Sequence, residues 1–275
     1  MKARTRQQPL VQSVGRSLDL LEALAEPGEL GLVELSTRVG LQPSTVHRLL
    51  STLVERGYAV QSAATGRYLL GYKLIELAGY LNKRTEHLRT LTRPHLTSIQ
   101  KVTGESANLI VLESPNIVYV DQVEGSRSLR MFARIGAAVP AHATAAGKAI
   151  LAFMPQAPLG DVFGAEPLPR STAHTITSLD VLGDELARVL RRGYAIDNEE
   201  HETGVGCVAA PIFDYAATPV AAISISAPIQ RIHAADPAEL GELLMNRAGE
   251  ISRELGFVAG APGPRARFHD AETHV

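Results

Sequence analysis

Hydrogen-bonding side chains line one face of a helix that is predicted to begin at Pro43. The polar face carries Ser44, Thr45, His47, Arg48, Ser51 and Thr52. The opposite face is an apolar stripe of Val46, Leu49, Leu50 and Leu53. A helix of this width fits the major groove of B-form DNA, where such side chains bind the edges of bases. The pattern indicates DNA recognition, and the alternative is a face that only meets solvent.

Other polar groups near this helix are suited to contact the phosphate backbone of DNA. Gln42 and Ser44 lie at its N-terminal end, where phosphate oxygens are favoured. Arg67 is expected in the following hairpin, where it could touch the DNA backbone or the minor groove, and Arg16 lies in the first predicted helix, from which it could contact a phosphate. Residues 1–100 carry 13 Lys and Arg against 8 Asp and Glu, although the whole chain has a net charge of −2. A basic N-terminal part favours an anionic partner.

A second set of short polar groups lies in the C-terminal half and could bind a small molecule. The small residues Thr144, Ala145, Ala146 and Gly147 open a predicted helix, whose free N–H groups can hold a carboxylate. Asp197, Cys207, Ser224 and Ser226 add polar side chains, and the two serines share a face if their strand is antiparallel. Leu109 and Met131 are expected on the apolar side of this pocket.

Each of these residues also has a structural alternative. Cys207 could be a small buried apolar residue. Lys148 could contact a strand instead of an anion, and the acidic run at 197–200 could be a solvated loop.

The N-terminal elements predict a winged helix-turn-helix. Val14, Leu18, Leu21 and Ala25 recur at helical spacing, and a short helix at 32–39, with Leu32, Leu35 and Val39 inward, ends at Gly40. Two residues later Pro43 opens the polar-faced helix, and short extended pieces at 58–61 and 67–70 form a hairpin. Such a module can also serve protein contacts, so a ligand-sensing protein-interaction module remains an alternative.

The rest of the chain predicts linker helices and an α/β (α+β) domain. Residues 72–91 form one long helix, Arg93-Pro94 breaks it, and 96–102 form a second; a plain core helix is the alternative. Strands are expected at 107–113, 117–123, 129–133, 194–197, 205–213 and 220–227. Helices are expected at 143–153, 178–191 and 237–255. Strands in adjacent runs indicate an antiparallel sheet with helices packed on it.

Several function classes lack support in the sequence. A single cysteine among 275 residues excludes an internal disulfide and a cysteine-rich zinc site, and it suggests a reducing, cytoplasmic setting. No signal peptide or membrane span is expected. Phosphate-loop, dinucleotide and GxSxG patterns are missing, His201-Glu202 lacks the second histidine of HExxH, and Ser98–Lys101 matches SxxK without its companion motifs. We therefore expect no enzyme, no cofactor and no metal.

The string STVHRLLSTLVERGY at 44–58 is close to the recognition helix of the IclR family of bacterial transcriptional regulators, and the chain resembles that family. HATAAGKAILAF at 142–153, GYAIDNEEHETGVGCVAAPI at 193–212 and AAISISAP at 221–228 extend the resemblance to about residue 257. The implied organisation is a DNA-binding domain at 10–72, a linker at 73–104 and a GAF-like effector domain at 105–257. The tail at 258–275 lies outside the resemblance, and its mixed composition predicts disorder.

The resemblance also implies a function for both sets of residues. Members bind operator DNA as homodimers or homotetramers, with the linker helix helping to pair subunits, and they respond to small aliphatic or aromatic acids. The resemblance places the effector at Thr144, Ala145, Ala146, Asp197, Cys207, Ser224 and Ser226.

Overall fold

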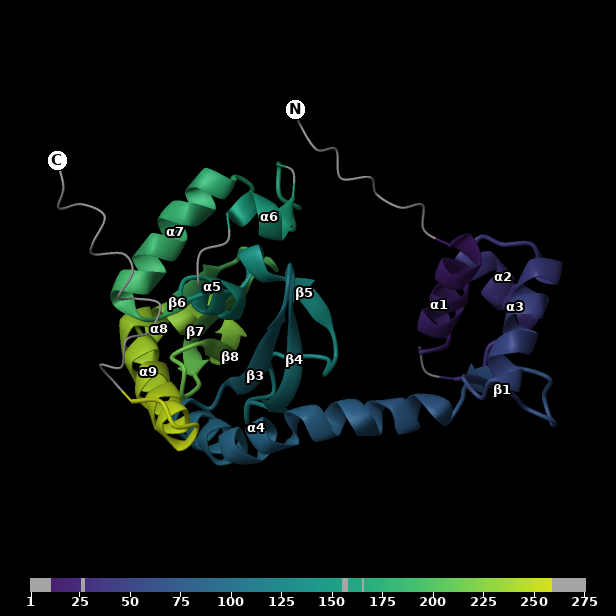
Figure 1. Cartoon of the computed structure of the whole chain (residues 1–275), viewed down its shortest axis with the longest axis horizontal. Coiled ribbons are helices and arrows are strands. Elements are labelled where there is room, and N and C mark those ends of the chain that lie inside the picture. The colour runs from purple at the N-terminus through teal and green to yellow at the C-terminus, as the bar shows by residue number, and fades with distance from the viewer. Residues whose placement is uncertain (1–10, 26–27, 155–157, 165, 259–275) are drawn as a thin grey trace. The chain divides into compact units, whose positions relative to one another are not determined.

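The computed structural model describes residues 11–25, 28–154, 158–164 and 166–258 (Figure 1). It divides the chain into two compact units, with the boundary between Arg84 and Thr85. The predicted tail lies, except for its first residue, outside the described residues, as does the first residue of the predicted DNA-binding domain.

The first unit is a winged helix-turn-helix. Its elements are α1 (Gln12–Leu24), α2 (Leu32–Val39), α3 (Pro43–Glu55), β1 (Ala59–Gln61) and β2 (Tyr68–Leu70). The two strands pair antiparallel, and Leu30 forms a bridge to Tyr68. Gly40 ends α2 with φ +64°, a left-handed conformation that glycine adopts without strain, and Pro43 is the first residue of α3, as predicted.

Packing selects which apolar residues of α1 enter the core. Leu20 and Leu24 are buried against α2 and α3, whereas Val14 and Leu18 are 57% and 53% exposed. The helix carries two apolar stripes of the same period, and packing against its neighbours decides which one enters the core. In α2 and α3 the predicted stripes do face inward, with Leu35 and Leu50 fully buried.

The predicted helix break at Pro94 is wrong. The helix α4 runs without interruption from Lys73 to Thr103 and contains Pro94 in its interior. Proline removes one backbone hydrogen bond, but tertiary contacts around it hold the helix together. Arg93 donates to the carboxylate of Asp121 at 2.7 Å, and Leu96 and Ile99 are fully buried in the core of the second unit.

The second unit is built on a six-stranded antiparallel sheet in the order β5-β4-β3-β8-β7-β6. The strands are β3 (Ser106–Glu113), β4 (Asn116–Val123), β5 (Ala138–Pro140), β6 (Ala195–Asn198), β7 (Val205–Phe213) and β8 (Pro219–Pro228). The helices are α5 (Ala145–Leu151), preceded by the short turn η1 (Ala141–Ala143), then α6 (Leu159–Phe163), α7 (Leu179–Arg192), α8 (Ile229–Ala234) and α9 (Pro237–Glu254). The combination of a helix-turn-helix unit with this antiparallel α+β unit confirms the predicted fold class.

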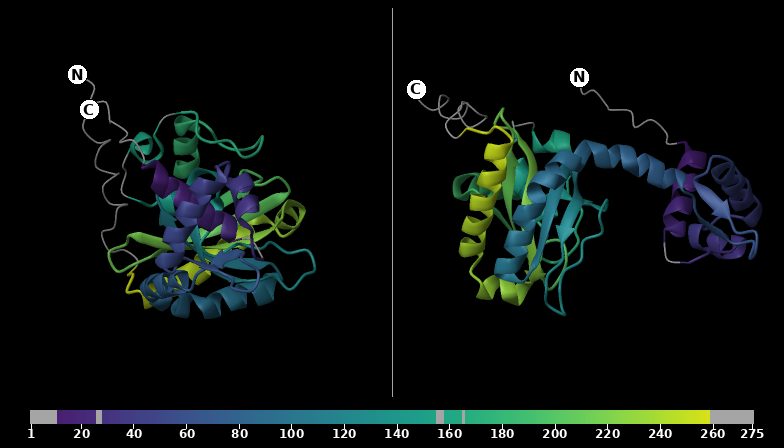
Figure 2. Two further views of the ribbon diagram at one scale, coloured as in Figure 1. Left: turned by 90° about the vertical axis from the view of Figure 1, so that its right-hand side faces the viewer. Right: turned by 90° about the horizontal axis from the view of Figure 1, so that it is seen from below.

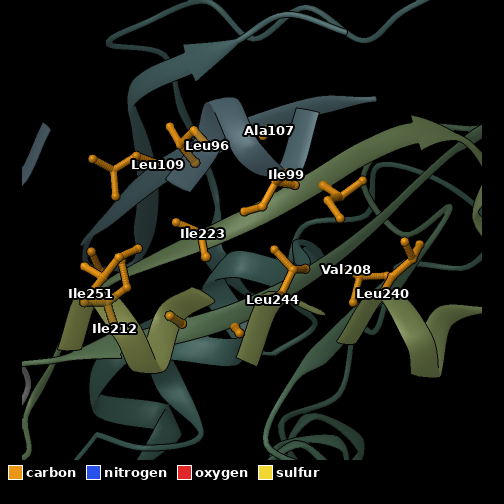
Figure 3. Close-up of a cluster of buried hydrophobic side chains, with 14 of the residues drawn as sticks. Leu96, Ile99, Ala107, Leu109, Val208, Ile212, Ile223, Leu240, Leu244 and Ile251 are labelled. Carbon is orange, nitrogen blue, oxygen red and sulfur yellow. The ribbon is translucent and has the colours of Figure 1, made fainter. Parts of the chain in front are cut away.

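Helices cover both faces of this sheet. The C-terminal part of α4 and α9 run side by side on one face, where their leucines and isoleucines meet the apolar side chains of β3, β7 and β8 (Figures 2 and 3). On the other face, α5 packs against Ala209 and Ala222, and α7 lies outside α5. Because side chains alternate along a strand, each strand contributes to both layers.

One predicted strand is not formed. Residues 129–133 belong to an irregular connection between β4 and β5, in which Leu129 and Phe132 are exposed. Its polar backbone groups bond instead to side chains of the sheet: Met131 accepts from Ser106 and Ala133 donates to Gln122. The other predicted strands lie within a residue or two of the observed ones. Among the described residues, no helix is long and apolar enough to cross a membrane.

Candidate functional site

The outer face of α3 is polar and exposed. Gln42, Ser44, His47, Arg48 and Thr52 are exposed and Thr45 is half-buried, while the stripe through Val46, Leu50 and Leu53 fills the core. Two hydroxyls on this face already donate to the preceding turn, Ser51 to the carbonyl of His47 and Thr52 to that of Arg48. The helix can therefore present its polar side chains to a groove without disturbing its packing.

The two arginines predicted to contact phosphates have different surroundings. Arg16 is half-buried on α1. Arg67 donates to the carbonyl of Glu29 at 3.0 Å and pairs with the carboxylate of Glu34 at 2.5 Å, which ties the hairpin to the start of α2. The amide of Gly31, and after it Arg67, lowers the pKa of Glu34. Arg67 keeps further N–H groups for a second partner, since a guanidinium has five.

Four polar side chains of the second unit lie in one row across the sheet. Asp197 of β6 is opposite Cys207 of β7, Cys207 is opposite Ser226 of β8, and Ser226 is opposite Ser106 of β3. Paired residues in an antiparallel sheet point to the same face, which here is the one covered by α5. A neighbouring row contains Ser224, Asn108 and Gln122.

Hydrogen bonds connect these two rows. The amide nitrogen of Asn108 donates to the hydroxyls of Ser224 and Ser226, both at 3.1 Å, and the thiol of Cys207 donates to Ser226 at 3.2 Å. Gln122 donates to the amide oxygen of Asn108 at 2.7 Å. Sequence reasoning missed Asn108, Ser106 and Gln122. The signal was present, since Asn108 interrupts an otherwise apolar strand.

The start of α5 lies over the same face of the sheet. Thr144 caps the helix by accepting from the amide of Gly147 at 3.1 Å, as a threonine before a helix commonly does. Ala145 and Ala146 are buried and belong to the cluster that contains Ala209 of β7. Gly147 is required here, because a Cβ atom would stand 2.1 Å from the carbonyl oxygen of Ala141.

Burial dominates the electrostatics of this region. Asp197 is 3% exposed, and burial raises its pKa to about 7, although its carboxylate accepts from the amide of Glu200 at 2.7 Å. Burial also raises the pKa of the Cys207 thiol and of the Tyr119 hydroxyl, and the nearby carboxylate of Asp197 raises both further. Cys207 therefore remains a neutral thiol and is not an activated nucleophile.

The acidic run at 197–200 is not a solvated loop. Glu200 is buried and pairs with the ammonium of Lys148, which is 1% exposed. Lys148 also lies 4.0 Å from the carboxylate of Glu185 on α7. The charge of Lys148 is thus balanced inside the protein. The sequence left open whether Lys148 contacts a strand or an anion, and the structure shows that its partner is the carboxylate of Glu200.

The two apolar residues predicted for the pocket lie on different faces. Leu109 must be removed from it, because its side chain is fully buried between the sheet and the α4/α9 layer, opposite to Ser224 and Ser226 (Figure 3). In β3 the residue that faces the serines is its neighbour Asn108. Met131 is half-buried, and its carbonyl accepts from Ser106 at 2.5 Å, so it stays beside the polar row.

Other kinds of site find little support. Within the part of the chain that the structure describes, no group of three or more His, Cys, Asp and Glu side chains could hold a metal ion. A hollow of about 620 Å³ lies between α6 and α7 and contains none of the predicted residues; Leu159, Gly160, Leu179, Asp180, Gly183 and Asp184 line it.

Comparison with known families decides the identity of the chain. The family described as bacterial transcriptional regulator IclR, C-terminal, matches residues 80–253, and the IclR helix-turn-helix domain matches residues 13–63. The chain belongs to the IclR family. Its curated relatives are transcriptional regulators, which confirms the expectation that it is not an enzyme.

Individual relatives of this IclR-family protein agree over nearly the whole chain. The transcriptional regulator XynR of Escherichia coli is 35% identical over 252 residues, covering 91% of this chain and 100% of its own. The crystal structure of IclR from Thermotoga maritima superposes with a TM-score of 0.73 at 35% identity, covering 90% and 100%. An IclR homologue from Microbacterium hydrocarbonoxydans, crystallised with 4-hydroxybenzoate, gives a TM-score of 0.71 at 27% identity, covering 88% and 98%.

Proposed function

We propose that this IclR-family regulator binds operator DNA through the outer face of α3, as a homo-oligomer, and responds to a small organic acid bound between α5 and the sheet. The observation that carries the DNA-binding part is the exposed polar face of α3 on a winged helix-turn-helix. In this proposal Ser44, Thr45, His47 and Arg48 meet base edges. Arg16, Gln42, Thr52 and Arg67 meet the phosphate backbone.

The test of DNA binding is the variant Arg48→Ala. Duplexes bound by the wild type are first selected from a random library, and affinity is then measured by fluorescence anisotropy at several salt concentrations. A lost base contact weakens specific binding by about 1–3 kcal/mol, or roughly 5- to 150-fold. Arg191→Ala, which removes an exposed arginine of the second unit, is the matched control. Wild-type affinity that is weak and independent of salt would instead favour the protein-interaction module.

The effector site is supported by the polar rows on the α5 side of the sheet. Asp197, Cys207, Ser224 and Ser226 are joined there by alanines of α5 and by Thr144, in apolar surroundings that favour a small ligand. The related protein crystallised with 4-hydroxybenzoate supports an acid of the aromatic class, and an aliphatic acid is the other class.

Thermal unfolding against a panel of aliphatic and aromatic acids tests the effector site. A ligand at about 100 times its dissociation constant adds roughly 2.7 kcal/mol to the free energy of unfolding. Ser226→Ala should lose this stabilisation while DNA affinity is retained, and Ser128→Ala, an exposed serine, should behave as the wild type. An unchanged ligand response of Ser226→Ala would remove Ser226 from the site.

Homo-oligomerisation is supported by apolar residues that the first unit leaves uncovered. Val14 and Leu18 are exposed on one stripe of α1, and Val11 is exposed just before it. Ile75 is exposed in the first turn of α4, and Tyr72 is exposed just before that helix. We propose that a second copy of the chain covers these residues, as an isologous contact requires. Sedimentation velocity should show weaker association for Leu18→Glu, and an unchanged oligomer would argue against α1 as a contact.

A further inference from the structure

A directed chain of hydrogen bonds runs from the backbone of the 124–137 connection to the two serines of the proposed effector site. The amide of Ala133 donates to the side-chain oxygen of Gln122 at 3.2 Å. The side-chain nitrogen of Gln122 donates to the oxygen of Asn108, and the nitrogen of Asn108 donates to Ser224 and Ser226. Asn108 and both serines are buried, so water does not compete for these bonds.

The direction of this chain is set at its first bond. A backbone N–H can only donate, so Gln122 must turn its oxygen to Ala133 and its nitrogen to Asn108. Asn108 must then turn its oxygen to Gln122 and its two N–H groups to the serines. If both amides were reversed, the nitrogen of Gln122 would face the N–H of Ala133, and this part-buried donor would lose its partner.

These bonds leave Ser226 with only a proton to offer a further partner, whereas Ser224 keeps its proton and one lone pair. A hydroxyl has one proton and two lone pairs. Both lone pairs of Ser226 are used, one by Asn108 and one by the thiol of Cys207. One lone pair of Ser224 is used by Asn108. Neither serine gives its proton to Asn108, so both protons are available on the α5 side of the sheet.

We infer that Asn108 and Gln122 are positioning residues that fix Ser224 and Ser226 as hydrogen-bond donors and thereby select an effector with acceptor oxygens at this point. A carboxylate or a ketone oxygen can accept from both hydroxyls, whereas an ammonium or amidinium group finds no free lone pair on Ser226 and only one on Ser224. This inference rests on the proposed effector site. It assigns specificity to two residues that need not touch the ligand.

A purely structural role for Asn108 would not depend on the direction of the amide. Any side chain that satisfies the serines would then preserve the site. Asn108→Asp has nearly the same shape but only accepts when ionised, so the serines must donate to it. Gln122→Glu acts one step further away: its second oxygen faces Asn108, which must then turn its nitrogen to Glu and its oxygen to the serines. Gln122→Met cannot hydrogen-bond to Asn108, so it leaves the orientation of the Asn108 amide unconstrained without reversing it.

The first measurement needs no ligand. Neutron diffraction from deuterium-exchanged crystals of the full chain locates the protons directly. The expected map has both deuterons of the Asn108 amide on the lines to Ser224 and Ser226, with the serine deuterons directed elsewhere. A serine deuteron directed at Asn108 would overturn the inference. This result stands whether or not the site binds an acid.

The second measurement compares two probes by calorimetry at pH 8. 4-Hydroxybenzoate offers acceptor oxygens, and 4-hydroxybenzamidine offers only donors at the same end. The wild type should prefer the acid, and Asn108→Asp and Gln122→Glu should reduce that preference roughly tenfold or more, with Gln122→Met in between. If Gln122→Glu prefers the acid over the amidine as strongly as the wild type does, and circular dichroism shows that it is folded, the inference is overturned. If the wild type binds no acid of the thermal panel, the proposed effector function fails, while the neutron map still decides the direction of the chain.

Discussion

The buried carboxyl of Asp197 makes a quantitative prediction about stability. Its environment in the folded chain combines almost complete burial with the backbone amides of Glu200 and His201 and with the opposing charges of Glu200 and Lys148. Asp197→Asn keeps an oxygen for the Glu200 amide but cannot ionise. The pH dependence of the difference in unfolding free energy between wild type and this variant therefore measures the cost of ionising Asp197 inside the folded protein.

The magnitude follows from the two pKa values. In the unfolded chain the carboxyl ionises at its ordinary pKa of 3.8, whereas burial raises the pKa of Asp197 to about 7 in the folded protein. Below about pH 4 both states are protonated. Between these pKa values the folded state binds more protons than the unfolded state, so stability falls as pH rises. The total loss is roughly 4 kcal/mol, and the curve is flat above about pH 8.

Because the chain has two compact units, the stability of the second unit is measured separately, by hydrogen exchange of the backbone amides in β7 and β8. Wild type and Asp197→Asn are compared from about pH 4.5 to 8, with Asp161→Asn, an exposed carboxyl, as the matched control. The wild type should lose stability relative to Asp197→Asn as pH rises. A difference that stays constant, or that grows in favour of the wild type, would refute burial as the dominant effect and would indicate that Lys148 outweighs it.

Three further changes test the packing of each unit. Lys148→Met leaves Glu200 buried without its cation and should lower the free energy of unfolding, measured in urea, by about 3–5 kcal/mol. The double variant with Glu200→Gln should recover much of this loss, and no recovery would contradict the pairing of Lys148 with Glu200. Gly147→Ala places a methyl group 2.1 Å from the carbonyl oxygen of Ala141, so both the melting temperature and acid binding should fall; unchanged values would show that α5 can shift freely. Leu50→Ala opens a cavity in the fully buried core of the first unit and should cost about 2–5 kcal/mol, measured by hydrogen exchange in α1; a loss below 1 kcal/mol would mean that this core repacks easily.

Much of the DNA-binding unit was predictable because its signals are local. The left-handed turn at Gly40 favours a residue without a Cβ atom, and Pro43 suits the first position of a helix. The polar and apolar faces of α3 follow from the 3.6-residue period, because only one of its faces is apolar. In α1, where Leu18 and Leu20 lie on competing stripes, the same period could not choose between them.

The candidate effector site was predictable in its residue types but not in its arrangement. Ser224 and Ser226 share a face by the two-residue period of a strand. That Leu109 faces the α4/α9 layer while Asn108 meets the serines depends on the register of β3 against β8, a contact between segments more than a hundred residues apart.

The helix-turn-helix, its polar face and the polar residue types of the proposed effector site follow from local chemistry along the chain. Tertiary structure alone decided that α4 passes through Pro94, that Lys148 and Glu200 neutralise one another, and that an amide chain ends on two serines. The physical reason is that propensity and period act over a few residues. Burial, strand register and the balance of charges are set only when distant segments meet.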